Sequence, residues 1–149
     1  SLRLGFILAP ERLVESFERI CKTWLSGVPT ATQAIAADFM DEGMFATHIR
    51  TMRQLYKDRH DTLIDAAQSL KGRIDVIPTG SGFHTTGRLA DDLLEVEIVE
   101  RAREKGIETT PLNRYALAPI KESGIILGFG SSPPDEIRRG VKTLESLVC

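Results

Sequence analysis

The chain has 149 residues, of which 42% are hydrophobic and 27% are charged, a balance typical of a globular protein with one core. Its formal net charge of −2 provides no overall electrostatic attraction to nucleic acid. The longest uncharged apolar stretch, residues 6–10, is too short to cross a bilayer, and the start lacks a signal-peptide pattern. These features indicate a cytoplasmic protein.

The cysteines and histidines are not spaced as metal ligands. Cys21 and Cys149 show no redox or metal spacing, and Cys21 falls on the apolar face of a predicted helix, which favours a reduced core thiol. His48 and His60 share one predicted helix but are too far apart along it to hold one ion, and His84 lies in a predicted strand. We therefore expect no metal site.

The first elements in the chain are a strand and a helix. Residues 2–8 have the apolar pattern of a buried strand, although only Ser1 precedes them. Pro10 suits the first turn of a helix, because its missing N–H does no harm there. Apolar side chains then recur at helical spacing as far as Leu25, and Gly27 is a natural terminator.

Two further helices follow. Thr30 and Gln33 have the spacing of a capping box at the start of the second helix, which residues 42–43 end. A third and longest helix is predicted from about Phe45 to Leu70, where one apolar stripe continues until Gly72.

The second half alternates strands with helices. Its predicted elements are strands at 73–78 and 82–89, a helix from Asp91 to Gly106, strands at 107–111 and 124–130, and a helix capped by Ser132 with Pro133 in its first position. The last helix should pack Ile137, Val141, Leu144 and Val148 inward. The order predicts an α+β (mixed α/β) fold, a small mixed sheet covered by helices and preceded by a long helix.

A basic stripe runs along the third helix. Arg50, Arg53 and Lys57 are three and four residues apart and share one face. The stripe either binds an anion or nucleic acid, or is a solvated face that neighbouring aspartates partly neutralise. The acidic net charge favours the solvated face.

Arg3 stands inside the first apolar strand. An arginine rarely enters a buried strand unless its guanidinium meets an anion, because an unpaired buried charge is very costly. Its planar donor fork suits a phosphate. The alternative is an edge strand whose arginine reaches solvent or an internal carboxylate.

Four segments together resemble the C-terminal part of the MocR group of bacterial regulators, in the GntR superfamily. They are "SLRLGFILAP", "GVPTATQAIAADFMDEGMFATHIRTMRQLYKDRHDTL", "GSGFHTTGRL" and "GIILGFGSSPPDEIRRGV". The most specific element is G-x-F-x-x-H-I-R-x-M-R-x-L-Y-x-x-R, which covers Gly43 to Arg59. The resemblance implies a fold-type I aminotransferase-like domain that binds pyridoxal 5′-phosphate (PLP), forms a homodimer, and follows an N-terminal winged helix that binds DNA.

Within that family pattern, the chain corresponds to the small-domain part. Residues 1–42 are expected to be the end of the large domain, and residues 43–149 the long connecting helix and the C-terminal small domain. In the family, Arg3 matches the arginine that holds the PLP phosphate. The Schiff-base lysine would lie upstream of Ser1, and Lys22, beside Cys21 on a predicted packing helix, is no substitute.

The resemblance also marks a departure on the strongest predicted strand. Ile126 stands where aminotransferases of this fold usually carry an arginine for the substrate carboxylate. A neutral branched side chain cannot make that bidentate contact, which argues against ordinary transamination. Arg114, in a loop that approaches the cofactor in the family, is a candidate for an anion contact; the alternative is a solvated loop arginine.

These features are compatible with three functions of the chain. The leading one is the C-terminal fragment of a PLP-binding effector domain of a GntR/MocR-type regulator, with an amine or amino acid as effector. The fragment itself is expected to be non-catalytic and not to hold PLP stably. The alternatives are the C-terminal domain of a PLP-dependent aminotransferase, for α-aminoadipate or a related amino acid, and a dimerisation module that binds no PLP.

Overall fold

The computed structural model describes residues 4–24, 27, 29–118 and 120–148. The chain forms two compact units that divide between Thr51 and Met52; unit 1 is residues 1–51 and unit 2 is residues 52–149. The longest helix, α3 (Met44–Ala66), begins in unit 1 and ends in unit 2.

Unit 1 contains α1 (Glu11–Trp24), α2 (Thr30–Asp41) and the start of α3. The Pro10 carbonyl accepts a hydrogen bond from the Leu13 N–H at 2.8 Å, so α1 begins at the predicted place. The predicted cap of α2 is wrong by one residue. Pro29 is the N-cap, and its carbonyl accepts the first backbone hydrogen bonds, so Thr30 is already helical.

The strand predicted at residues 2–8 is absent from residues 4–8, which have no regular secondary structure. The side chains of Phe6 and Leu8 are 86% and 91% exposed, so they are not buried either. A strand needs a neighbour for its backbone hydrogen bonds, and no strand occurs among the described residues of unit 1. Apolar alternation alone therefore did not produce a strand here.

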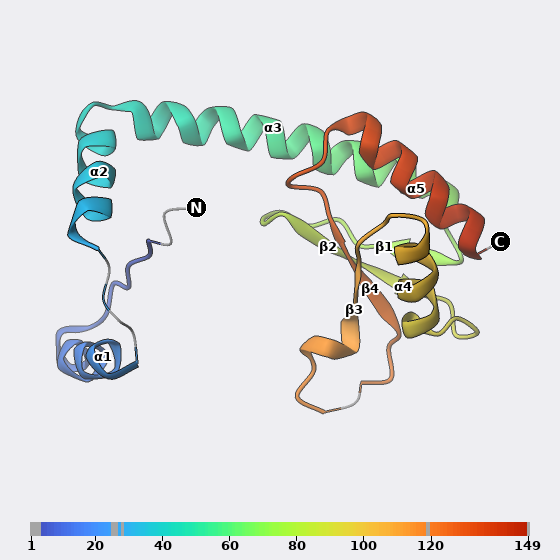
Figure 1. Ribbon diagram of the computed structural model, residues 1–149, viewed down its shortest axis with the longest axis horizontal. Helices are drawn as coiled ribbons and strands as arrows, with labels where there is room; N and C mark the ends of the chain where they lie inside the picture. Colours follow the sequence, from blue (N-terminus) through green and yellow to red (C-terminus); the bar gives the residue numbers. More distant parts are fainter. Residues whose placement is uncertain (1–3, 25–26, 28, 119, 149) are drawn as a thin grey trace. The chain divides into compact units, whose positions relative to one another are not determined.

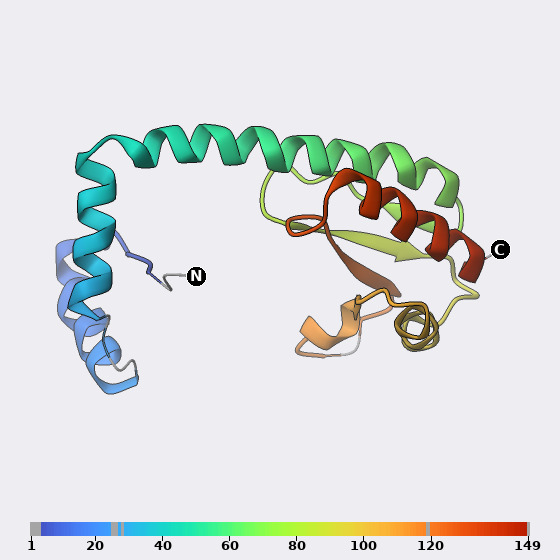
Figure 2. The same cartoon turned by 45° about the horizontal axis from the view of Figure 1, so that its top comes forward.

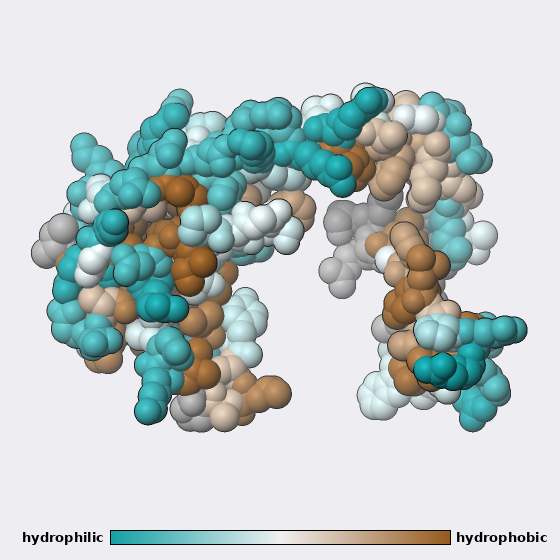
Figure 3. Space-filling view, turned by 180° about the vertical axis from the view of Figure 1, so that it is seen from behind, coloured by the Kyte–Doolittle hydropathy of each residue, from teal (hydrophilic) through white to brown (hydrophobic). Residues whose placement is uncertain are grey.

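The apolar face of α1 is also exposed. None of the residues of α1 is buried, and Figure 3 shows apolar atoms at the surface of this unit. Ile20 is 55% exposed and Trp24 is 81% exposed. Cys21 is a free, half-buried thiol rather than the core residue that the helix pattern predicted.

Unit 2 is built on a four-stranded sheet in the order β1-β2-β4-β3, in which the strongest apolar strand, β4, is internal (Figure 1). All three strand pairs are antiparallel, so the sheet is not the mixed sheet that the sequence predicted. The strands are β1 (Ile74–Val76), β2 (His84–Leu89), β3 (Thr110–Pro111) and β4 (Gly124–Gly128).

Helices cover one face of this sheet. The C-terminal part of α3 continues into the 3-10 helix η1 (Ala67–Leu70) and lies beside α5 (Pro134–Val148), while α4 (Glu95–Glu104) packs against α5 and β4 (Figure 2). The core between the helices and the sheet includes Leu70, Ile74, Ile98, Ile125, Phe129 and the predicted inward residues of α5, which are Ile137, Val141, Leu144 and Val148.

Two helix starts differ slightly from the prediction. α4 begins at Glu95, because Asp91 and Asp92 form a turn before it. α5 begins at Pro134, and the Pro133 carbonyl accepts the first backbone hydrogen bonds. Among the residues that the structure describes, no helix could span a membrane and no group of side chains could hold a metal ion.

Candidate ligand-binding groove

One face of the unit 2 sheet is not part of the core. Successive side chains of a strand point to opposite faces. In β2 and β4, the residues that alternate with the core residues therefore lie on the second face of the sheet. This open face carries His84, Thr86 and Arg88 of β2, with Ile126 and Gly128 of β4. His84 and Arg88 are exposed, and Thr86 and Ile126 are half-buried.

Ile126 lies in the middle of the open face, between two threonines. Its register partners are Thr86 on β2 and Thr110 on β3. The next residue back, Thr109, donates its hydroxyl to the Ile126 carbonyl at 2.7 Å and so fastens β3 to β4. The position that resembles the carboxylate-binding site of aminotransferases thus has an apolar side chain with hydroxyls on both sides.

A short 3-10 helix, η2 (Leu112–Tyr115), lies against one end of the open face. The Leu112 side chain would lie 3.1 Å from a Cβ built on Gly124, so only glycine fits there without displacement. This close packing of Leu112 on β4 brings the following residues, Arg114 and Tyr115, to the edge of the sheet. Both side chains are exposed.

A groove of about 1050 Å³ is bordered by β3, β4 and η2, by the C-terminal end of α4 and by α5 from Glu136 to Leu144, and its lining includes side chains from both faces of β4. Its lining includes Ile126 and Thr110 from the sheet and Arg114 and Tyr115 from η2. Sites for small ligands are usually concave and combine apolar surface with a few polar groups. This groove is therefore the candidate binding site of unit 2.

The groove has more positive than negative side chains. Arg103, Lys105, Arg114 and Arg139 contribute to its lining, whereas Glu108 and Glu136 are its only acidic lining residues among those that the structure describes. Several hydroxyl groups add hydrogen-bond donors, among them those of Thr110 and Ser132. Guanidinium and hydroxyl donors are suited to a carboxylate or a phosphate.

Of the site residues considered in the sequence analysis, one lies in the groove, one lies on the surface of α1 and one is outside the described residues. Arg3 lies outside the described residues. Arg114 lies in the groove, on the same side of β4 as Ile126, and is exposed. Lys22 is an exposed residue of α1 whose Nζ pairs with a Glu18 carboxylate oxygen at 3.1 Å, so it has the surface setting expected of a lysine with no covalent role.

The basic stripe on α3 is partly neutralised by its own helix. Lys57 forms an ion pair with Asp61, four residues later, and the Arg50 guanidinium donates to the Thr47 hydroxyl at 3.4 Å. The hydrogen bond from Lys57 lowers the pKa of Asp61, and the same bond raises the pKa of Lys57. These contacts are those of a solvated helix face.

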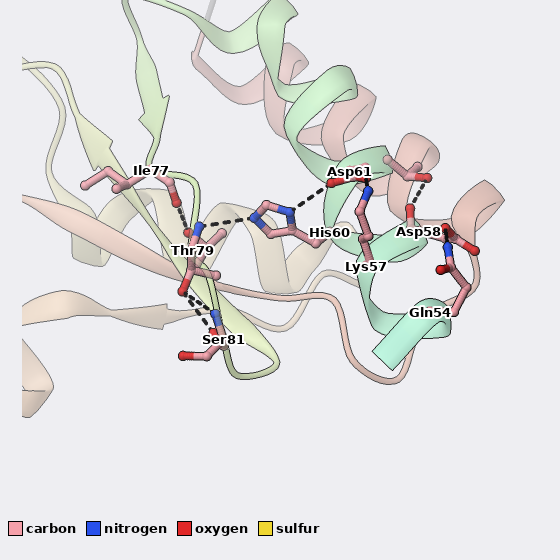
Figure 4. A network of polar contacts seen from close by, with 10 residues as sticks. Gln54, Lys57, Asp58, His60, Asp61, Ile77, Thr79 and Ser81 are labelled. Atoms are coloured by element: carbon pink, nitrogen blue, oxygen red, sulfur yellow. Dashed lines mark hydrogen bonds and ion pairs between the residues drawn. The ribbon is translucent and has the colours of Figure 1, made fainter. Parts of the chain in front are cut away.

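The last residue of the family motif on α3, Arg59, and the residue after it, His60, join the helix to the loops of the sheet. His60 Nε2 accepts the backbone N–H of Thr79 at 3.1 Å, in the loop after β1, while its Nδ1 lies 3.3 Å from Asp61 (Figure 4). The Arg59 guanidinium donates to the Gly130 carbonyl, in the turn after β4. Periodicity did not reveal these contacts, because their partners are far away in sequence.

Glu95 is a second residue that sequence reasoning missed. It is 8% exposed, and its carboxylate accepts the backbone N–H groups of Asn113 and Gly124. These two residues lie near the two ends of the groove loop, the segment 112–124 that joins η2 to β4. In the sequence it looks like an ordinary acid in the first turn of a helix. No local signal distinguishes it from Glu97, which is exposed.

The resemblance assigns the PLP contacts to residues outside the described part of the chain. The family pattern requires a phosphate-binding arginine and a Schiff-base lysine, and Arg3 lies outside the described residues. Lys105, in the groove lining, is exposed at the end of α4. The open face and η2 can supply one wall of a binding site, and no chemical step is assigned to them.

Nearly the whole chain matches a known protein family. The model of the aminotransferase class I and II family matches residues 1–142. A protein of Rhizobium meliloti described as a probable rhizopine catabolism regulatory protein, MocR, is 31% identical over 147 residues, 98% of this chain and 30% of that protein. YhdI of Bacillus subtilis, described as an HTH-type transcriptional regulator, is 28% identical over 98% of this chain and 31% of its own length.

Solved structures show the same fold. An archaeal alanine:glyoxylate aminotransferase has a TM-score of 0.85 at 18% identity, over 99% of this chain and 37% of its own. LysN, the α-aminoadipate aminotransferase of Thermus thermophilus, solved with N-(5′-phosphopyridoxyl)-L-leucine, has a TM-score of 0.82 at 17% identity, over 95% of this chain and 36% of its own. The chain thus spans about a third of the length of these relatives.

Proposed function

Because the chain belongs to the aminotransferase class I and II family, we propose that it is the C-terminal part of a PLP-binding effector domain in a MocR-type transcription regulator. The observation that carries the proposal is the similarity to HTH-type regulators along 98% of the chain. Residues 1–42 are then the end of the large domain, and residues 43–149 the connecting helix and small domain.

The rest of the proposal concerns partners of the whole protein. A winged helix outside this chain binds DNA, and two copies form a homodimer in the cytoplasm of a bacterium. An amine or amino acid is the effector, which binds where the groove meets the cofactor. Its binding favours one of two domain arrangements, because only a ligand with different affinities for two states can shift their populations.

Two arginines have roles in this site. Arg3 holds the PLP phosphate, since a guanidinium fork matches phosphate oxygens. Arg114 binds the carboxylate of the effector, and the positive lining of the groove supports that role. Ile126 is apolar, so the usual carboxylate contact from β4 is missing and the groove loop supplies it instead.

Titration of the full-length protein with PLP tests the cofactor role. We expect the visible absorbance band of lysine-bound PLP, and we expect Arg3→Ala to weaken binding of PLP but not of pyridoxal, which lacks the phosphate. Arg12→Ala, on the exposed surface of α1, is the control. No band in the wild-type protein would contradict the proposal and favour the dimerisation module.

A second candidate function is transamination, which the fold similarity to aminotransferases favours. It predicts turnover of an amino donor with a 2-oxo acid by the full-length protein. We expect no turnover with α-aminoadipate or aromatic amino acids, because Arg114 would hold the carboxylate from η2 and not from the β4 position, here Ile126, that usually orients the substrate in aminotransferases. Steady turnover that requires PLP would identify the protein as an enzyme.

A further inference from the structure

Glu95 is an unusual residue in the core of unit 2. Apart from Thr85, it is the only buried polar or charged residue among those that the structure describes, with 8% of its surface exposed. Removing a carboxylate from water is costly unless hydrogen bonds replace the lost hydration. The placement therefore requires specific partners.

The partners of Glu95 are two backbone N–H groups at opposite ends of one loop. Oε1 accepts the N–H of Asn113 at 3.2 Å, and Oε2 accepts the N–H of Gly124 at 3.1 Å. Asn113 belongs to η2, and Gly124 is the first residue of β4. A single side chain on α4 thus closes the loop between these elements, which we call the groove loop (residues 112–124).

A further hydrogen bond joins two residues within the groove loop. Asn113 Oδ1 accepts the backbone N–H of Ile120 at 3.2 Å. Tyr115 is 69% exposed and Leu117 fully so. Beyond Leu112, which packs on β4, apolar burial therefore contributes little to the order of the loop, and closing a flexible loop costs chain entropy. The hydrogen bonds that Glu95 and Asn113 accept offset part of that cost.

We propose that Glu95 is a positioning residue, which holds the groove loop so that Arg114 is preorganised to bind a carboxylate ligand. Arg114 immediately follows Asn113, whose N–H Glu95 holds, so the start of its backbone is fixed before ligand arrives. Preorganisation lowers the entropy lost on binding and so raises affinity. The inference rests on the proposed role of Arg114 in the groove.

The test uses Glu95→Gln, which keeps the shape of the side chain. One amide oxygen still accepts a hydrogen bond, but the NH₂ group faces the second backbone N–H, so two donors oppose each other. Glu97→Gln, an exposed change two residues away in the same helix, is the control. Hydrogen exchange of the full-length protein should speed up in peptides from 112–124 and stay unchanged in β2.

Ligand affinity separates a positioning role from a purely structural one. The probe is glutarate, a dicarboxylate, titrated calorimetrically into the full-length protein. We expect Arg114→Ala and Glu95→Gln each to weaken binding about tenfold, the effect of losing one charged hydrogen bond. The double variant should bind no more weakly than Arg114→Ala alone, because Glu95 acts through Arg114.

The possible failures are distinguishable. If Arg114→Ala weakens glutarate binding but Glu95→Gln does not, the positioning role is wrong and the proposed function stands. If the wild-type protein does not bind glutarate, or Arg114→Ala binds it equally well, the role of Arg114 in the proposed function is wrong. Should Glu95→Gln fail to fold, Glu95→Asp, which keeps the charge but shortens the side chain so that it cannot reach both N–H groups, must produce the same two effects.

Discussion

At the scale of single residues, long-range contacts decide what the family motif does. Tyr56 belongs to the predicted apolar stripe of the long helix, and its ring packs edge-on against Phe83 at 4.5 Å between centroids. Arg59 donates to the Gly130 carbonyl, and the Gly130 N–H in turn donates to the Phe83 carbonyl at 3.3 Å. These residues tie α3 to both internal strands.

Gly130 is fixed by this packing. A Cβ built on it would lie 2.8 Å from the Phe83 Cβ, which no flexible side-chain end can relieve. We expect Gly130→Ala to lower the free energy of unfolding by about 1–3 kcal/mol, as overpacking does. Gly80→Ala, where a Cβ meets nothing within 4 Å, is the matched control for denaturant unfolding. Equal stability of the two variants would contradict this packing.

The Lys57–Asp61 pair predicts a pH dependence with a definite sign. The hydrogen bond from Lys57 lowers the pKa of Asp61 in the folded chain, so the pair stabilises the fold above the unfolded pKa of about 3.9. That contribution disappears as the pH falls through the lower folded value. Lys57, with a raised pKa, loses its contribution only as the pH rises above about 10.4.

Unfolding of Asp61→Asn at two pH values measures this effect. At neutral pH the variant should be slightly less stable than the wild type, because the pair is exposed and screened. Well below pH 3.9 the two proteins should unfold at the same denaturant concentration. A stability difference that persists in acid would show that Asp61 acts by something other than its charge.

At the scale of elements, the amphipathic helix of unit 1 is not buried. α1 has apolar side chains at helical spacing, as does α5, yet α1 buries none of them and α5 buries five. The α5 residues meet η1 and α4, whereas Ile20 and Trp24 of α1 remain exposed. A helix pattern therefore indicates which face can be buried, and not what covers it.

Two isoleucine substitutions test this difference directly. Ile125, on β4, is completely buried, and Ile20 is 55% exposed. We expect Ile125→Ala to destabilise the chain by about 2–5 kcal/mol and Ile20→Ala by less than about 0.5 kcal/mol. Denaturant unfolding of the chain measures both. A comparable loss for Ile20→Ala would mean that α1 is packed in solution.

At the scale of the whole molecule, the chain is one part of the proposed PLP site. Its lysines at positions 22 and 105 are exposed, and the described residues form one wall beside Ile126 and Arg114. The other parts of the site belong to the proposed longer protein. The chain and that protein should therefore behave differently toward PLP.

Borohydride reduction makes this difference measurable. A mixture of the 149-residue chain and PLP, reduced and analysed by mass spectrometry, should show only scattered lysine modification. The same treatment of the full-length protein should give one stoichiometric adduct, because a Schiff-base lysine reacts at a single site. A single stoichiometric adduct on the chain alone would contradict the proposed division of the site.

The sequence by itself determined the helices α1 to α5, the four strands and the family resemblance. These depend on local periodicity, turn residues and motif spacing, which a linear reading contains, and the comparisons confirm the family and fold. It also identified Ile126 and Arg114, which the structure places in one groove. The role of Arg3, outside the described residues, stays a prediction.

Only the tertiary structure decided which patterned surfaces are buried and how the groove loop is held. The apolar run at residues 4–8 and α1 lack partners in unit 1, so they stay exposed despite their patterns. Glu95 and Arg59 have partners that are far away in sequence. Burial and long-range hydrogen bonds depend on which segments meet in space, and no local pattern specifies that.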